Sequence, residues 1–95
     1  DRPGFRNSSC LSWSPLDFAT LKKINLVSTP SLFMDSHFYD YKQFSPAERK
    51  SQMRYWIEEC KIVHGSVAVL WHTHTIGSDY GWRAGFQDLL CIIVE

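Results

Sequence analysis

The sequence predicts an α/β domain in which strands alternate with helices. Two observations carry this prediction: an amphipathic helical pattern spans residues 45–64, and a short, wholly apolar run follows it at 67–71. A second apolar helical pattern begins near Trp82. With an earlier strand before residue 35, the order becomes strand, helix, strand, helix, which is typical of parallel sheets. The 95 residues suffice for one domain or a piece of one.

The first 44 residues carry weaker signals. Pro3-Gly4 and the polar residues after it predict a loop that continues to about residue 16. Residues 16–23 are predicted to form one or two helical turns. A strand is predicted over 24–29; it stops at Pro30 and resumes over 32–34. Residues 36–44 are predicted to form an ordered, aromatic-rich loop.

The helix over 45–64 has the clearest start and stop signals. Ser45 can accept a backbone hydrogen bond as the cap, Pro46 suits the first helical position, and Glu48 completes a capping box. Gly65 is predicted to end the helix in a left-handed conformation. The buried stripe is predicted to consist of Met53, Trp56, Ile57, Cys60 and Val63.

The run at 67–71 does not alternate, so we expect a strand covered on both faces. The last helix has an expected buried stripe of Phe86, Leu89, Leu90 and Ile93. Two or three strands are too few to bury a parallel sheet. The chain is therefore predicted to be cut from a larger domain, and to be poorly folded or self-associating by itself.

Composition excludes several classes of partner. Ten basic and ten acidic residues give zero formal charge, so a nucleic-acid partner is not expected. No apolar run approaches the ~20 residues of a membrane span. Three widely spaced cysteines predict neither a disulfide framework nor a structural zinc site. Cys60 and Cys91 are expected in helix cores and Cys10 in a loop, which slightly favours a reducing, cytoplasmic compartment.

Two predicted strands end in polar side chains. Asp35 follows 32–34 and His72 follows 67–71, and the carboxyl ends of parallel strands share one edge. A carboxylate beside a histidine can hold one ring nitrogen and make the ring a better proton donor. Arg6 is a third candidate. Two other interpretations stay open: His72 only caps its strand, or His72 and His74 form an H-x-H metal pair.

Several short motifs resemble a known family. The stretch 1–6 (DRPGFR) is similar to one in a branch of the polysaccharide deacetylase superfamily, the NodB-like carbohydrate esterase family 4. Residues 30–35 (PSLFMD) resemble its "P-L-x-x-M-D" segment, and 65–74 resembles "G-G-x-x-x-L-L-W-H-N". The motifs occur in the family's order and cover nearly the whole chain.

The resemblance implies the C-terminal fragment of a distorted (β/α) barrel that removes acetyl groups from carbohydrate with a divalent metal, usually zinc. It implies that His72 is the catalytic acid, that Asp35 tunes it, and that Arg6 orients a base. Trp71, beside the acid, is expected to bind substrate. The metal ligands and the base would precede Asp1, so the metal is not expected on this chain, which we expect to be inactive alone.

Two rival functions remain. One is a non-catalytic barrel of the same fold that binds a glycan or a protein through the aromatic loop 36–44. The other is a small, independent α/β interaction domain.

Overall fold

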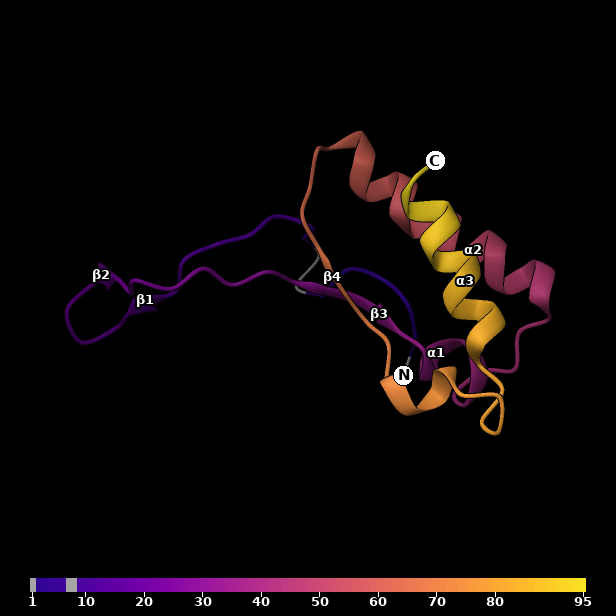
Figure 1. The fold of residues 1–95 in the computed structure, drawn as a ribbon. Helices are drawn as coiled ribbons and strands as arrows, with labels where there is room; N and C mark the ends of the chain where they lie inside the picture. Colours follow the sequence, from indigo (N-terminus) through magenta and orange to yellow (C-terminus); the bar gives the residue numbers. More distant parts are fainter. Residues whose placement is uncertain (1, 7–8) are drawn as a thin grey trace.

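The computed structural model describes residues 2–6 and 9–95 and shows a mixed α/β chain (Figure 1). Asp1, Asn7 and Ser8 of the resembling segments lie outside the described residues. Two separate two-stranded sheets are present, and no closed barrel forms within the described ranges. The elements in chain order are β1 (Leu16–Asp17), β2 (Lys22–Lys23), β3 (Ser31–Met34), α1 (Ser36–Tyr39), α2 (Pro46–Ile62), β4 (Ala68–Leu70), the 3₁₀ helix η2 (Thr73–Ile76) and α3 (Arg83–Ile93).

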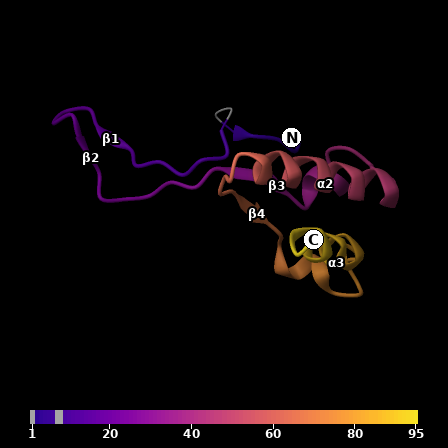
Figure 2. The ribbon, with the colours of Figure 1, turned by 90° about the horizontal axis from the view of Figure 1, so that it is seen from above.

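Residues 30–95 form a packed unit, here called the head. Its centre is the parallel pair β3–β4, and α2 and α3 pack against each other beside this pair (Figures 1 and 2). The strand over 32–34 and the strand after the long helix are therefore confirmed, and so is their parallel direction. The buried hydrophobic cluster consists of Leu32, Phe33, Phe38, Met53, Ile57, Leu89 and Ile92.

The start of α2 is as predicted. The Ser45 hydroxyl accepts from the Glu48 amide at 3.2 Å, and the Glu48 carboxylate accepts from the Ser45 amide at 3.0 Å. Its end differs from the prediction, because His64, with φ of 52°, takes the left-handed position expected for Gly65. The Gly65 amide then bonds the Cys60 carbonyl at 2.9 Å. Gly65 is needed for space, since an added Cβ would lie 2.6 Å from Cys10 Sγ.

Two predicted burial patterns are wrong in part. On β4, Ala68 and Leu70 are exposed, so the described chain does not cover both faces of this strand. On α3, Leu89 and Ile92 are buried, whereas Leu90 and Ile93 are about half exposed. Val63 is likewise exposed at the end of α2. The buried face of α3 therefore consists of Gly85, Leu89 and Ile92, which face the rest of the head, and differs from the predicted stripe.

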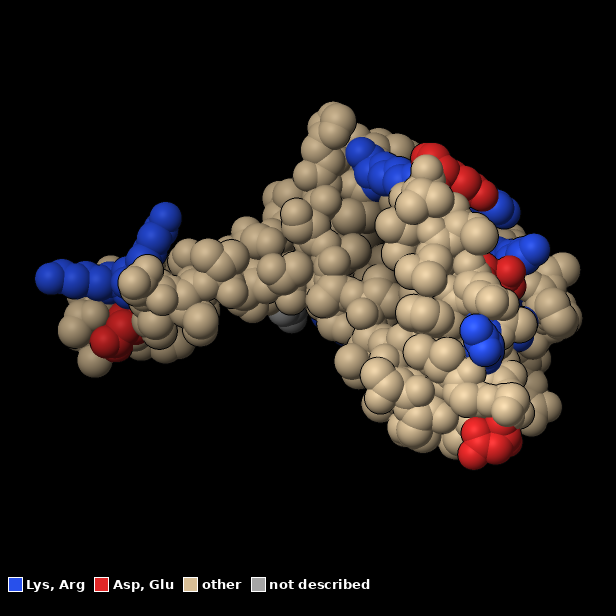
Figure 3. All heavy atoms as spheres, in the orientation of Figure 1, with Lys and Arg blue, Asp and Glu red and all other residues tan. Residues whose placement is uncertain are grey.

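Residues 11–29 leave the head as an extended arm (Figure 1). Here two predictions are wrong: 16–23 is the hairpin β1–β2 rather than helical turns, and 24–29 contributes only an isolated bridge from Ser28 to Trp13. The hairpin turns where Asp17 Oδ1 accepts from the Ala19 amide and Leu21 adopts φ of 56°. Figure 3 shows charged side chains gathered at the arm's tip.

The arm dominates the shape of the molecule. The radius of gyration is 15.5 Å and the longest extent is 50 Å. A compact domain of this length would have a radius of gyration of about 12 Å. Apolar side chains on the arm stay in solvent, among them Phe18 and Leu21, which are 88% and 76% exposed.

The remaining predictions have mixed outcomes. Residues 36–39 form α1 where a loop was expected, and Thr73–Ile76 forms η2. Cys60 is buried as predicted, but Cys10 is buried too and Cys91 is exposed. Among the described residues, no helix combines the length and apolar character needed to cross a bilayer.

Candidate functional site

The parallel pairing of β3 and β4 brings Asp35 and His72 together. The Asp35 amide bonds the Leu70 carbonyl at 3.1 Å, which continues the pairing one residue beyond β3. Both strands therefore end at the same edge, as expected for sites on parallel sheets. His72 Nδ1 lies 2.7 Å from Asp35 Oδ1. This geometry agrees with the prediction that the two side chains share one rim.

The Asp35 carboxylate is completely buried and held by several donors. Oδ1 accepts from the Ser36 amide at 2.8 Å and faces His72 Nδ1. Oδ2 accepts from the His72 amide at 2.9 Å. Because Asp35 bonds both the backbone and the ring of His72, it fixes the position and the orientation of that ring.

These bonds also determine the charge of Asp35. Burial by itself raises the pKa of the carboxyl group, but the hydrogen bonds from the His72 backbone, the His72 ring and the Ser36 amide together lower it below its usual value. Asp35 is therefore ionised at neutral pH. An ionised carboxylate can only accept, so Nδ1 of His72 carries the proton that it donates. Nε2 is then the ring nitrogen left to act on a ligand.

Thr75 supports the same corner from η2. Its buried hydroxyl lies 2.6 Å from the His72 carbonyl and 3.2 Å from Asp35 Oδ2. One hydroxyl proton cannot serve both acceptors fully, so the shorter contact is its main hydrogen bond. Thr75 was missed in the sequence, although its place three residues after His72 is the spacing at which a hydroxyl reaches back to a backbone carbonyl.

His72 opens into a hollow of about 220 Å³. Its side chain is 43% exposed, while its carboxylate partner is not exposed at all. The hollow is lined by Ser36, Asp40, His72, His74, Thr75, Tyr80 and Trp82. Tyr80 packs edge-on against both the His74 and the Trp82 rings, and Trp82 stacks on Tyr39 at 4.6 Å. The hollow thus combines one oriented imidazole with aromatic walls.

Arg6 lies beside His37 of α1, and no described hydrogen bond joins it to Asp35 or His72. Its guanidinium donates to the Arg2 carbonyl at 2.8 Å and lies 3.3 Å from His37 Nε2. The Met34 amide donates to His37 Nδ1 at 3.1 Å. Burial and the nearby Arg6 charge lower the pKa of His37, with Asp35 opposing them. His37 is thus a second buried histidine that sequence reasoning missed.

Trp71 is part of the packing between β4 and α3. Its ring lies 5.8 Å from Phe86 and 6.3 Å from Tyr39, with the Tyr39 ring perpendicular to it. Gly85 allows this approach, because an added Cβ would lie 3.0 Å from the Trp71 ring. The ring is partly buried. Trp71 does not line the hollow beside His72, and its role in binding substrate stays a prediction.

The described residues do not supply a metal site. No group of three His, Cys, Asp or Glu side chains in ranges 2–6 and 9–95 could hold an ion. The His72 and His74 rings are 5.8 Å apart, and His72 Nδ1 is already bonded to Asp35. His72 and His74 therefore lack a third ligand among the described residues, and the zinc that the resemblance implies, with its ligands before Asp1, stays a prediction.

Comparison of this chain with family models, with curated proteins and with solved structures finds no match in any of the three.

Proposed function

We propose that this chain supplies the acid histidine of a hydrolytic carbohydrate deacetylase. The observation that carries the proposal is the 2.7 Å contact between a half-exposed His72 ring and a fully buried carboxylate. An imidazole oriented in this way, with its second nitrogen open to a hollow, is the arrangement of a general acid or base. The substrate class comes from the resemblance of three ordered motifs to the polysaccharide deacetylases.

The chemistry assigned to this chain is one proton transfer. When water has added to an N-acetyl carbonyl, the C–N bond breaks as His72, protonated on both ring nitrogens, gives its Nε2 proton to the leaving nitrogen and keeps the Nδ1 proton that Asp35 holds; the acetyl group leaves as acetate. Asp35 is buried and cannot touch the substrate, so it acts as a positioning residue that holds Nδ1. The base that activates the water is not assigned to any residue of this chain.

The described residues do not form a metal site. The resemblance places the metal ligands and the base in sequence before Asp1. We propose accordingly that activity requires a longer protein in which those residues accompany this chain.

The barrel belongs to the same proposal. The β3–β4 pair is parallel, and Ala68 and Leu70 stay exposed on one face of β4. A parallel sheet is normally covered on both faces. We propose that further strands of a distorted NodB-like barrel, contributed by an N-terminal part of the domain, adjoin this pair. When that part is missing, we propose that the exposed face is covered instead by self-association of this chain.

The test compares two histidines of the same hollow in a protein that carries this chain together with the preceding sequence. His72→Ala should lower kcat for acetate release from N-acetylglucosamine oligomers by about 10²–10⁴-fold. His74→Ala is the matched control, since His74 lies in the same hollow and packs against Tyr80. It should cause a much smaller loss. Metal content, measured on both variants, should stay unchanged.

Three results would contradict the proposal. Full activity in His72→Ala would remove the acid role, and joint loss of metal in both variants would favour an H-x-H metal site instead. Absence of hydrolysis in the wild-type protein, with retained binding of the same oligomers, would favour the non-catalytic binding module.

A further inference from the structure

A second cavity lies beside α1, on the face next to the one that borders the His72 hollow. Ser36 of α1 and its C-cap Asp40 line the hollow beside His72, whereas His37 of α1 and Tyr41 line the second cavity. The second cavity has a volume of about 340 Å³, within the range of small-ligand sites. Among the described residues, the hollow and the second cavity share no lining residue, and His72 does not line the second cavity.

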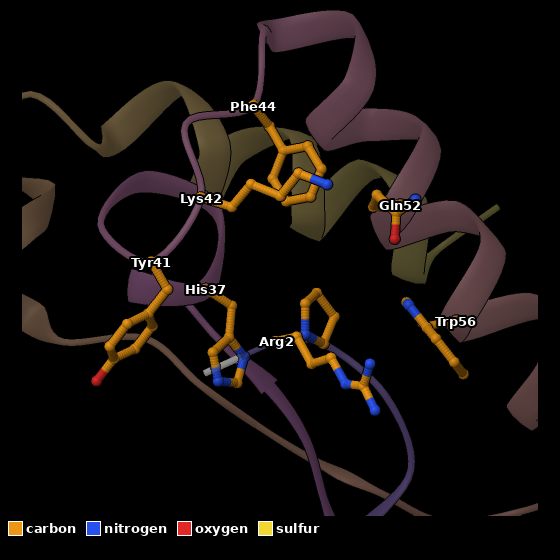
Figure 4. Close-up of a pocket in the computed structure, with 8 residues that line it drawn as sticks. Arg2, His37, Tyr41, Lys42, Phe44, Gln52 and Trp56 are labelled. Atoms are coloured by element: carbon orange, nitrogen blue, oxygen red, sulfur yellow. The ribbon is translucent and has the colours of Figure 1, made fainter.

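Three aromatic side chains form walls of this cavity: Tyr41, Phe44 and Trp56 (Figure 4). Trp56 is fixed by perpendicular contacts with Phe5 and Tyr55, at 5.4 and 5.0 Å between ring centroids. Rings that are already held in place can pack on the flat face of a ligand with little loss of conformational entropy.

The polar groups of the cavity are cationic or neutral. Arg2 and Lys42 line it, and no Asp or Glu among the described residues does. The Lys42 ammonium is held 5.1 Å above the Phe44 ring, at the edge of the same space. Figure 4 shows the Lys42 and Arg2 side chains on either side of the cavity.

The buried His37 reports the same positive environment. Its Nε2 faces Arg6 at 3.3 Å, and the Arg6 charge is one of the causes that lower the pKa of His37. Among the ion pairs of the described residues, none involves Arg2, Arg6 or Lys42. Among the described residues, Arg2 and Lys42 line the cavity, Arg6 lies behind it at His37, and the nearby Asp35 carboxylate is buried and bonded to His72 and Ser36 rather than to these cations. The lining itself is therefore cationic, which favours an anionic ligand.

We propose that this cavity binds a small anion that carries a flat-faced six-membered ring, with the acidic group between Arg2 and Lys42 and the ring against Tyr41 and Trp56. A ring carboxylate has both features, and a hexuronate is the carbohydrate of this kind. The inference does not depend on the hydrolytic function, because it uses a separate cavity and no proton transfer.

The test is calorimetric or NMR titration of a protein that carries this chain together with the preceding sequence, with four probes: glucuronate, its neutral counterpart glucose, benzoate and inorganic phosphate. Glucuronate and benzoate should bind at least about tenfold more tightly than glucose, and 0.5 M NaCl should weaken their binding because charge pairs are screened. Phosphate, which has charge but no ring, should bind more weakly than either. If glucose bound as tightly as glucuronate, the acidic group would not be recognised, and the charge assignment would be overturned. If phosphate bound as tightly as glucuronate, the ring would not be recognised, and the ring assignment would be overturned.

Variants locate the site. Lys42→Gln and Arg2→Gln should each weaken glucuronate binding by about fivefold or more, and Tyr41→Ala should weaken both ring probes. Lys50→Gln is the matched control, since Lys50 is half exposed on α2, pairs with Asp88 at 3.7 Å and does not line the cavity. Thermal melts check that each variant is folded. An equal loss in Lys50→Gln, or no loss in folded Lys42→Gln and Arg2→Gln, would overturn the proposal.

Discussion

The head and the arm are both rich in apolar side chains, yet only the head buries them. Leu32, Phe33 and Phe38 of the head are completely buried, while Phe18 of the arm is 88% exposed. In the head, apolar residues recur with the period of a helix or fill a short run that pairs with another strand. In the arm they alternate only over short stretches such as 11–14 and 24–26, and no second element of the described chain packs on them, so they stay exposed.

The two regions also differ in what holds their backbones. The arm relies on short cross-strand contacts, such as the pair of hydrogen bonds between Trp13 and Ser28 at 2.9 and 2.6 Å. An isolated hairpin of this kind has marginal stability in water. The head adds a capped helix, parallel strands and a packed cluster to its hydrogen bonds. Composition alone therefore does not predict which region folds stably. The spacing of the apolar residues and the elements that pack against them do.

The largest expected difference between the regions concerns two phenylalanines. Phe33→Ala should lower the free energy of unfolding by about 3–5 kcal/mol, because it removes a fully buried ring and leaves a cavity. Phe18→Ala, the control in the arm, should change it by less than about 0.5 kcal/mol. Urea denaturation followed by circular dichroism measures both. Similar costs would mean that the arm packs against something in solution.

A smaller effect is expected at the Asp35 carboxylate. Removing this buried, charged acceptor by Asp35→Asn should cost about 1–3 kcal/mol at neutral pH. The pKa of Asp35 is lowered in the folded chain, so its contribution is fully present above the unfolded value of about 3.8 and is lost as pH falls below that value.

Urea titrations between pH 3 and 7 should therefore show a drop in wild-type stability at the acid end, which Asp35→Asn reduces. Asp17→Asn in the arm controls for the loss of one acidic charge; Asp17 Oδ1 accepts only the Ala19 amide at 2.9 Å among the described contacts. An acid-induced drop of the same size in Asp35→Asn would contradict the role given to this carboxylate.

Two serine hydroxyls give a finer comparison. Ser45→Ala should cost about 1 kcal/mol, because the hydroxyl caps the 17-residue helix α2. Ser12→Ala in the arm removes a hydroxyl that lies 3.1 Å from the Thr29 hydroxyl in an exposed position. It should change stability by less than about 0.5 kcal/mol. If the two substitutions lowered the free energy of unfolding equally, the Ser45 cap would not contribute measurably to the stability of α2.

The smallest effect on stability is expected at Cys91. Cys91→Ser should leave the free energy of unfolding within about 0.5 kcal/mol, because this thiol is exposed on α3. Labelling with a thiol reagent at pH 8 should modify Cys91 first. Cys60 should react slowly, since burial and the adjacent Cys10 raise the pKa of its thiol. Fast labelling of Cys60 would indicate that α2 opens near its end.

Local signals in the sequence were enough for α2, β3 and β4. Ser45, Pro46 and Glu48 specify a helix start without help from distant residues, because all the bonds of a capping box lie within one turn. The apolar runs before Asp35 and His72 are short and end in polar side chains, so the meeting of these two residues follows once the strands are parallel. Their alignment at one edge was therefore foreseeable.

Only the tertiary structure decided the rest. Which face of α3 is buried depends on its packing against α2, so Leu89 and Ile92 lie inside and Leu90 and Ile93 do not. Arg6 lies beside His37 rather than Asp35, and Cys10 reaches Gly65, through contacts between segments about 30 and 55 residues apart. Sequence specifies contacts within a turn or along a strand, where chain geometry fixes the distances, whereas contacts over longer separations depend on how the elements pack.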